Sequence, residues 1–320
     1  MELITGENDK DRRLDRILRK ALPDYPLPFI HKLLRQKRVL VNGKPGKPED
    51  RLNCGDKIFI EKEFTQKSIE PAVRGTKDTE KGLEDSNLDI LWQNDDLIAV
   101  YKPAGIAVHG DDSLDVTVRS YLADKLPPSL SFKPGPLHRL DKPSSGVVIF
   151  SKSLEGARLF TSLMRQRKVK KTYLAVVEGK IKSGEIWQDD LVRDKDKKKT
   201  FTAKAKDTGK SAITKVTPLF FKDGYTLMEA EIETGRTHQI RAQASAHGHP
   251  LAGDIKYGGK TRSGNRELET GKSADIFLHA WKLEFSDVKI EAPAKTAILN
   301  MNPNRFPDGV YKCLSVFLSS

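Results

Sequence analysis

Residues 138–150 read HRLDKPSSGVVIF, a polar, turn-rich loop followed by four apolar residues. Asp141 is the only carboxylate of the loop, with an arginine two residues before it and a histidine three residues before it. Val147–Phe150 has the length and apolar character of a buried strand. The pattern predicts a single acid that a buried strand holds where substrate can reach it. A turn-capping role for Asp141 is the simpler alternative.

The segments around this loop predict a domain over residues 88–320. Expected strands cover residues 89–92, 97–101, 147–150, 172–177, 212–221, 225–233 and 277–285, and expected helices cover 114–122, 154–164 and a segment after Arg236. Strands outnumber helices and do not alternate with them, so we expect an α+β fold on a mixed, mainly antiparallel sheet. The Lys-rich segment 186–210 predicts a protruding hairpin or loop, whose role the sequence does not reveal.

Residues 10–62 predict a small separate module. Its two expected helices share an apolar face made of Leu14, Ile17, Leu18, Ala21, Ile30, Leu33 and Leu34. Asp11 is expected to cap the first helix, and Lys32 and Arg35 lie on the outer face of the second. Turn signals at Asn42-Gly43 and Gly55-Asp56 precede strand-like runs. A basic helical face on a small sheet predicts docking on folded RNA through phosphate contacts.

Positive charge is concentrated in two regions of a chain whose formal net charge is +12. Residues 158–210 contain 16 Lys and Arg against 7 Asp and Glu, and residues 1–62 contain 15 against 10. Two basic regions predict a polyanionic partner, most commonly a phosphate backbone. A generally basic surface is the alternative. Residues 63–87 are rich in both charges without apolar periodicity, and they predict a linker between the two domains.

Several protein classes are excluded by composition. No apolar run approaches the ~20 residues of a transmembrane helix, and no secretory signal opens the chain, so we expect a cytoplasmic protein without membrane contact. Cys54 and Cys313 are too isolated for a disulfide framework or a zinc site. His247 and His249 lack companion ligands, so no metal is expected. No phosphate-loop or dinucleotide glycine pattern is present, which predicts no nucleotide cofactor.

Three further motifs accompany the Asp141 loop. They are YKPAGIAVHG at residues 101–110, KKTYLAVVEG at 170–179, and ETGRTHQIR at 233–241 with HGHPLAGD at 247–254. In content and order the four motifs resemble the RluA-type RNA pseudouridine synthases, closest to the RluC/RluD branch, which modifies large-subunit ribosomal RNA. Residues 13–56 resemble an S4 domain, a small RNA-binding module. Lys142-Pro143-Ser144 departs from the threonine-containing loop of many members.

This resemblance implies that uridine is isomerised to pseudouridine at specific sites of structured RNA, without a cofactor. Asp141 would be the catalytic carboxylate, as a nucleophile at C1′ or as a proton acceptor beside it. Arg241 would pair with Asp141, and Tyr173 would stack on the flipped uracil and could shuttle its C5 proton. An ordinary strand-core tyrosine and a solvated helix arginine are the alternatives for Tyr173 and Arg241.

The resemblance also implies a set of residues that bind RNA or the target nucleotide. Arg139 would fill the space that the flipped uridine leaves. The other expected contacts are His138, Arg236, His238 and Ile240 near the pocket, and Lys32 and Arg35 in the S4-like module. Arg139, Arg236 and His238 could instead be structural, and the module could instead be a helical cap with solvated lysines.

Three other functions stay open from the sequence. The chain could direct the same reaction to transfer RNA, or bind ribosomal RNA during assembly without catalysis. It could also hydrolyse an N-glycosidic bond, although a second acid is missing from the motifs. We expect a monomer. The sequence does not identify the target uridine.

Overall fold

The structure is a computed structural model that describes residues 1–61, 88–194, 196, 198–203, 209–260, 276–301 and 306–315. The chain divides into two compact units. Unit 1 comprises Met1–Leu88, Thr117–Gly135 and Ser151–Ala157, and unit 2 comprises Asp89–Val116, Pro136–Phe150 and Arg158–Ser320. The expected linker at 63–87 lies outside the described residues, so the boundaries at 62 and 88 stay a prediction.

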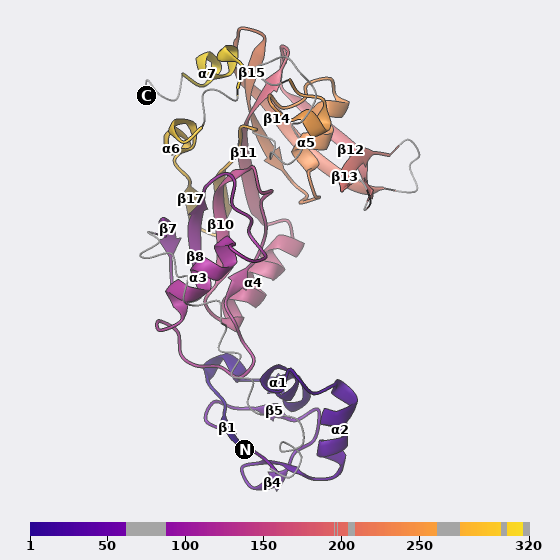
Figure 1. Ribbon diagram of the computed structural model, residues 1–320, viewed down its shortest axis with the longest axis vertical. Coiled ribbons are helices and arrows are strands. Elements are labelled where there is room, and N and C mark those ends of the chain that lie inside the picture. The colour runs from indigo at the N-terminus through magenta and orange to yellow at the C-terminus, as the bar shows by residue number, and fades with distance from the viewer. Residues whose placement is uncertain are drawn as a thin grey trace. The chain divides into compact units, whose positions relative to one another are not determined.

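Unit 1 begins with a small antiparallel sheet and two helices (Figure 1). The sheet has the order β1 (Glu2–Ile4), β6 (Lys57–Ile60), β3 (Val39–Val41), β4 (Lys44–Pro45), and β2 (Arg12–Arg13) pairs separately with β5 (Arg51–Leu52). The helices are α1 (Leu14–Ala21) and α2 (Leu27–Arg35), after the short helix η1 (Glu7–Asp9). Their apolar faces form one core, which includes Leu14, Ile17, Leu18, Ile30, Leu33 and Leu34.

In this module the turn predicted from its residues at Asn42-Gly43 is present, whereas the predicted helix cap is not. Asn42 and Gly43 both have positive φ, 51° and 81°, as a two-residue hairpin turn requires. The expected cap at Asp11 is wrong. Arg13 occupies the N-cap position of α1 without a side-chain cap. Asp11 has a φ of 57° and accepts a hydrogen bond from Arg51 instead.

The described residues also form an eleven-stranded sheet. Its path is β13 (Lys199–Thr202), β12 (Glu185–Asp194), β14 (Lys210–Lys222), β15 (Tyr225–Ile232), β11 (Val169–Glu178), β16 (Leu278–Phe285), β10 (Ser145–Ser151), β8 (Leu97–Lys102), β7 (Ile90–Gln93), with β17 (Val288–Glu291) on β16 and β9 (Gly135–Pro136) on β10. The pair β10–β16 is parallel, whereas the successive pairs from β13 to β16 are antiparallel. The predicted α+β class and mixed sheet are confirmed.

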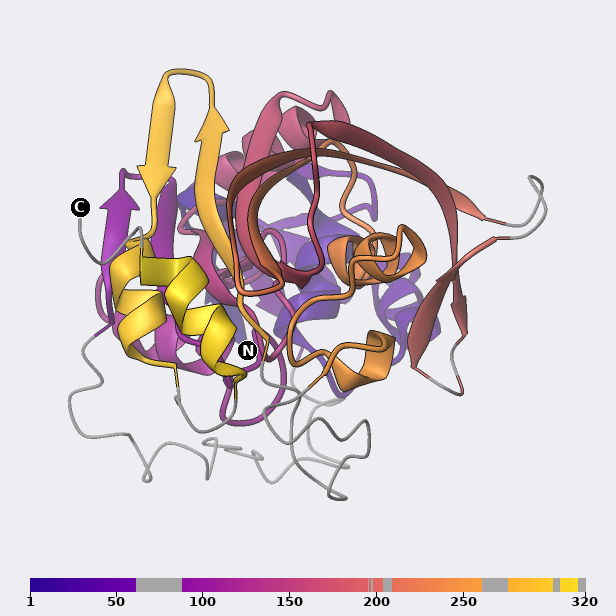
Figure 2. The ribbon, with the colours of Figure 1, turned by 90° about the horizontal axis from the view of Figure 1, so that it is seen from above.

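Helices cover parts of this sheet. Their bounds are Leu114–Leu122 for α3, Leu154–Arg165 for α4, Gln239–Ala246 for α5, Ile255–Tyr257 for η3, Ala294–Leu299 for α6 and Asp308–Leu314 for α7. Helix α5 lies within the curve of β12–β14 (Figure 2). Ser153 caps α4, since its hydroxyl accepts the Gly156 N–H at 2.9 Å. No described helix has the length and apolarity to span a membrane.

The parallel pair β10–β16 explains the glycine that ends the Asp141 motif. Gly146 lies opposite Ala280 and has a φ of 119°, in the region that favours glycine. A Cβ atom at Gly146 would lie 2.2 Å from the Ala280 carbonyl oxygen. The close approach of the two strands therefore requires glycine, and it fixes the strand that follows the Asp141 loop.

Candidate active site

Asp141 lies in the turn between β9 and β10. The Ser144 N–H donates to the Asp141 carbonyl oxygen at 3.0 Å, and the Gly105 N–H donates to the Lys142 carbonyl oxygen at 2.8 Å. The loop is thus tied to the turn that follows β8, which brings two of the four sequence motifs together. The Asp141 side chain keeps 16% of its surface exposed, so a substrate can reach it.

The buried side chain of Lys102 forms hydrogen bonds with both of these turns. Its side chain is fully buried, and its ammonium donates to the carbonyl oxygens of Pro103 and Ile106 at 2.8 Å and of Lys142 at 3.3 Å. Burial lowers the pKa of Lys102 to about 7, and the nearby Asp141 charge opposes this shift. Three carbonyl acceptors match the three N–H donors of a lysine ammonium. Lys102 therefore fixes the backbone one residue beyond Asp141.

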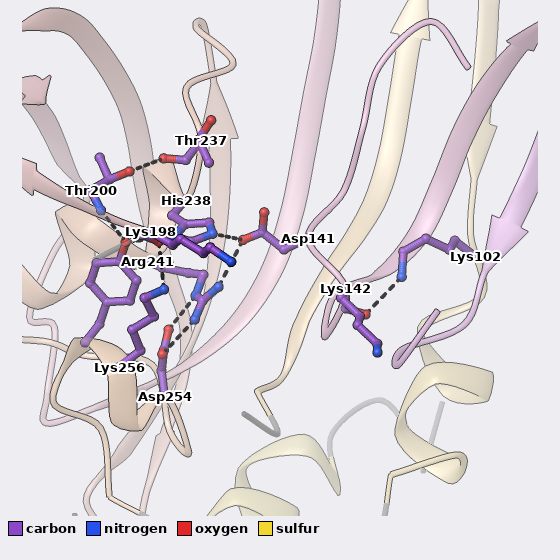
Figure 3. A network of polar contacts seen from close by, with 11 residues as sticks. Lys102, Asp141, Lys142, Lys198, Thr200, Thr237, His238, Arg241, Asp254 and Lys256 are labelled. Carbon is purple, nitrogen blue, oxygen red and sulfur yellow. Dashed lines mark hydrogen bonds and ion pairs between the residues drawn. The ribbon is translucent and has the colours of Figure 1, made fainter. Parts of the chain in front are cut away.

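Arg241 joins Asp141 to a second carboxylate (Figure 3). Its Nη1 lies 3.2 Å from Asp141 Oδ2, while its Nε and Nη2 donate to Asp254 at 2.6 and 2.9 Å. Burial alone would lower the pKa of Arg241, but the hydrogen bonds and charge of Asp254, with Asp141, raise it above its usual value. The expected pair of Asp141 and Arg241 is present. Asp254, which sequence reasoning did not assign, holds the guanidinium in place.

His238 approaches Asp141 from the start of α5. It occupies the N-cap position with a φ of 55°, and its Nε2 lies 3.8 Å from Asp141 Oδ2. Its Nδ1 lies 2.8 Å from the Tyr257 hydroxyl. Burial lowers the pKa of His238 to about 4, which the Asp141 charge only partly opposes. At neutral pH His238 is an uncharged neighbour of the carboxylate.

Tyr173 lies on β11, where the pairing with β16 shifts register between Thr172 and Tyr173. Its side chain is almost completely buried. Burial, together with the Asp141 charge, raises the pKa of Tyr173 well above its usual range. The phenol therefore keeps its proton over the physiological pH range, and its ring forms one wall of the site.

An open hollow brings most of the expected residues together. Seven expected residues line it: Arg139, Asp141, Tyr173, Arg236, His238, Ile240 and Arg241. Arg139 is exposed at its rim. Arg236 is also exposed and donates from Nε to the Ser211 carbonyl oxygen at 3.1 Å. The hollow combines an acid, cations, an aromatic ring and an apolar side chain.

Three expected residues do not line this hollow. His138 Nε2 accepts the Ile149 N–H at 3.1 Å, and its ring stacks on Phe160. His138 thus has an internal partner on β10. Burial, with the nearby Lys171 charge, lowers its pKa to about 3. Lys32 and Arg35 are exposed on α2 in unit 1, as their helical spacing predicts. The RNA contacts of all three stay predictions.

Sequence reasoning missed four residues that organise the site, namely Lys102, Gln239, Asp254 and Tyr257. Gln239 accepts the Arg236 N–H at 3.0 Å and the Thr234 hydroxyl at 2.7 Å, which shapes the turn before α5. Lys102, Gln239 and Asp254 occur inside the quoted motifs, and that position was the available signal, whereas Tyr257 lies outside them. In the described part of the chain, no cluster of three or more His, Cys, Asp or Glu side chains is arranged to hold a metal ion.

Known proteins match both parts of the chain. The RNA pseudouridylate synthase family model matches residues 96–246, and the S4 domain model matches residues 12–58. The chain is 32% identical over 317 residues to the ribosomal large subunit pseudouridine synthase D of Neisseria meningitidis, which covers 95% of this chain and 78% of that protein. It is 30% identical over 288 residues to the ribosomal large subunit pseudouridine synthase C of Haemophilus influenzae, covering 90% and 87%.

A solved structure shares the fold of the chain. Human RNA pseudouridylate synthase domain containing 4 is 25% identical, with a TM-score of 0.52, and the match covers 64% of this chain and 87% of the human chain. The two family models match the same two parts of the chain whose motifs resembled known families.

Proposed function

Because this chain belongs to the RNA pseudouridine synthases, we propose that it isomerises uridine in large-subunit ribosomal RNA and that Asp141 is its catalytic carboxylate. Two relatives that match most of the chain are named for the large ribosomal subunit. One observation carries the assignment of Asp141. It is the only carboxylate lining the described hollow that also holds Tyr173 and Arg241. Transfer RNA is the alternative substrate.

The reaction breaks the bond between ribose C1′ and uracil N1 and forms a bond between C1′ and C5. The proton leaves C5, and N1 gains one, so atoms balance without an oxidant or an energy source. A carboxylate contributes by stabilising positive charge that develops at C1′ or by attacking that carbon. Arg241 orients the Asp141 carboxylate and compensates its charge inside the hollow. Asp254 in turn prevents Arg241 from turning away.

The other side chains of the hollow suit a flipped uridine. A base inside a duplex or stack cannot reach a recessed acid, so it must be extruded. The Tyr173 ring offers a stacking surface, and Ile240 offers an apolar contact. Since its pKa is raised, Tyr173 does not act as a phenolate base. The exposed side chain of Arg139 would occupy the vacated stack or hold the flipped nucleotide.

The basic face of α2 supports a separate RNA contact. Lys32 and Arg35 are exposed within the segment that matches the S4 domain. Phosphate contacts of this kind supply affinity and register rather than sequence information. We propose that they hold the RNA while the hollow receives one uridine. A monomer in the cytoplasm remains our expectation for the working state.

An N-glycosidic hydrolase is less consistent with the geometry. Hydrolysis by general acid and base needs a second free carboxyl group. Asp254 is the nearest described candidate, but it is fully buried and both of its oxygens accept hydrogen bonds from Arg241. One available acid fits an isomerisation at C1′ better.

Release of the C5 proton tests the proposed function. Large-subunit ribosomal RNA and transfer RNA transcripts carrying tritium at uracil C5 are incubated with the protein, and tritium in water is counted. We expect release from large-subunit RNA with the native protein and none with Asp141→Asn, whose RNA affinity stays within about twofold. Release from transfer RNA alone would select the alternative substrate. Binding without release from either RNA would favour the assembly role.

A further inference from the structure

We propose that Tyr257 is a positioning residue of the active site, which holds His238 as a neutral imidazole with its Nε2–H directed at the Asp141 carboxylate. The proposal rests on the proposed function of Asp141. None of the motif roles expected from the sequence includes Tyr257. It would act through His238 rather than on the substrate.

Tyr257 contacts two of the groups that face Asp141. It ends the short helix η3 and is 4% exposed. Its hydroxyl lies 2.8 Å from His238 Nδ1, and the Arg241 guanidinium carbon lies 5.1 Å from its ring centroid. The same side chain therefore lies against both the imidazole and the guanidinium that approach Asp141 Oδ2.

The hydrogen-bond partners of the Tyr257 hydroxyl indicate where its proton lies. The Thr200 backbone N–H on β13 can only donate, and it donates to the Tyr257 oxygen at 2.9 Å. The hydroxyl proton is then available for the bare Nδ1 of His238. The Thr200 side chain also interacts with the Tyr257 hydroxyl, but its own hydroxyl proton goes to the Thr237 carbonyl oxygen at 2.9 Å.

The Asp141 charge decides between the two tautomers. His238 Nε2 lies 3.8 Å from Asp141 Oδ2. With the proton on Nδ1, the Nε2 lone pair would face a carboxylate oxygen and the two would repel each other. With the proton on Nε2, an N–H dipole faces the negative charge. Both the Tyr257 hydroxyl and Asp141 therefore favour the Nε2–H form.

The surroundings of His238 also favour its neutral state. Burial is the main cause of its lowered pKa, and the positive charges of Arg241, Lys256 and Arg193 add to it. Asp141 is the opposing charge. Loss of the Tyr257 hydroxyl would remove the group that keeps Nδ1 unprotonated. The imidazolium would then become more accessible beside Asp141.

The two neighbours of Asp141 lie on the same side of its carboxylate. Arg241 and His238 both approach Oδ2 of Asp141, at 3.2 and 3.8 Å. This leaves Oδ1 for the substrate. The dipole of a neutral N–H group helps to orient the carboxylate without neutralising it, whereas an imidazolium would pair with it and weaken its action at C1′.

Substitution Tyr257→Phe, with Tyr225→Phe as the matched control, tests the proposal on the full chain. Tyr225 lies on β15 in unit 2, half-buried and outside the hollow. The ¹⁵N and ¹H signals of His238 are measured in histidine-labelled free protein between about pH 5 and 8 and assigned with His238→Gln. Single-turnover pseudouridine formation is measured over the same range with tritiated RNA.

We expect the native protein and Tyr225→Phe to show the neutral Nε2–H tautomer throughout. Tyr257→Phe should show mixed tautomers and a raised His238 pKa, and its single-turnover rate at pH 7 should fall about tenfold, as loss of one buried hydrogen bond implies. The rate of this variant should fall further toward pH 5 as His238 gains its proton. RNA affinity should stay unchanged.

An Nδ1–H tautomer or an imidazolium in the native protein would overturn the proposal. So would a Tyr257→Phe protein that is merely less stable, with native tautomer and pH profile. The native spectrum alone decides the tautomer if the variant folds poorly. Because that spectrum is recorded without RNA, its outcome is independent of the proposed function. A protein with the expected tautomer but no tritium release would contradict the function and not the positioning.

Discussion

Arg241 lies between two carboxylates that serve different purposes. Asp254 is fully buried and binds the guanidinium through two hydrogen bonds, while Asp141 is partly exposed and receives one. The two-point contact fixes the plane of the guanidinium. The remaining guanidinium nitrogen is then directed at Asp141, the proposed catalytic carboxylate. Asp254 is thus buried and fully engaged by Arg241, whereas Asp141 keeps part of its surface exposed.

Replacing Asp254 by asparagine should affect both folding and catalysis. The neutral amide would leave the buried Arg241 without its two-point charge partner, so we expect the free energy of unfolding to fall by about 3 kcal/mol. The rate of pseudouridine formation should fall as Arg241 loses its fixed orientation. Urea denaturation and single-turnover assays measure the two effects. Native stability and rate in the Asp254→Asn variant would contradict the role of this pair.

Tyr173 should remain protonated in alkaline solution. Burial and the Asp141 charge both raise its pKa, so the neutral phenol persists where an exposed tyrosine near pH ~10 would ionise. Ultraviolet titration of the native protein, minus that of Tyr173→Phe, should show no tyrosinate signal up to about pH 10. A clear ionisation below that pH would reopen a role for Tyr173 as a base.

The elements around the site depend on one close strand contact. Strand β10 follows the Asp141 loop and pairs in parallel with β16 through Ser145 and Gly146. The Ser145 hydroxyl also lies 2.9 Å from His279 Nδ1. Strand β16 also pairs with β11, which contains Tyr173. The β10–β16 contact therefore fixes the position of the Asp141 loop relative to the Tyr173 ring, and we call these paired strands the frame of the site.

Substitution Gly146→Ala should disrupt this frame. The new Cβ would overlap the Ala280 backbone and the residue would be held at positive φ, so we expect a loss of at least about 3 kcal/mol of stability. Gly110→Ala is the matched control, because Gly110 has a φ of 110° but open space around its missing side chain. It should cost only about 1–2 kcal/mol. Equal melting temperatures for the two variants would contradict steric exclusion at Gly146.

Hydrophobic periodicity and turn residues predicted most elements of both units. Helix α3 and the strands β10, β11, β14, β15 and β16 are found where the sequence places them, within a few residues. Helices α6 and α7 were missed. They have only 6 and 7 residues, too short for a helical period to stand out, and their burial depends on contacts with Leu174, Val176 and Leu227.

The sequence predicted the site residues whose own side-chain chemistry suggests a role. It did not predict the residues that act through a contact with a residue far away in the chain. Asp141, Tyr173 and Arg241 stand in motifs with a plausible role each. Lys102 acts on a carbonyl 40 residues away, and Tyr257 acts on His238 from another element. His138 stands beside Arg139 in the sequence, yet the strand geometry turns it onto Ile149. Such pairings are set by the tertiary fold.

At the scale of the whole molecule, the two basic regions of the sequence fall in different units. The module at the start of unit 1 exposes Lys32 and Arg35, and the Lys-rich segment of unit 2 forms the β12–β13 hairpin in its described part. A partner that contacts the basic residues of both units would be a polyanion, and ribosomal RNA, the proposed substrate, is one.

Neutralising the α2 face should weaken RNA binding in a salt-dependent way. Lys32→Ala with Arg35→Ala removes two phosphate contacts, so the slope of log Kd against log salt should fall by about 1.5–2, while the chemical step on bound RNA stays intact. Lys289→Ala, at an exposed site on β17, is the control and should leave the slope within about one contact of the native value. Filter binding over a salt series measures it. An unchanged slope in the double variant would contradict RNA binding by this face.

The most direct test of the central claim is pseudouridine mapping of ribosomal RNA in cells that lack this gene. The cells are complemented with the native chain or with Asp141→Asn at equal protein levels. We predict that at least one pseudouridine of the large-subunit RNA disappears on deletion, returns with the native chain and stays absent with Asp141→Asn. Full modification in the deleted cells, or restoration by Asp141→Asn, would contradict the account.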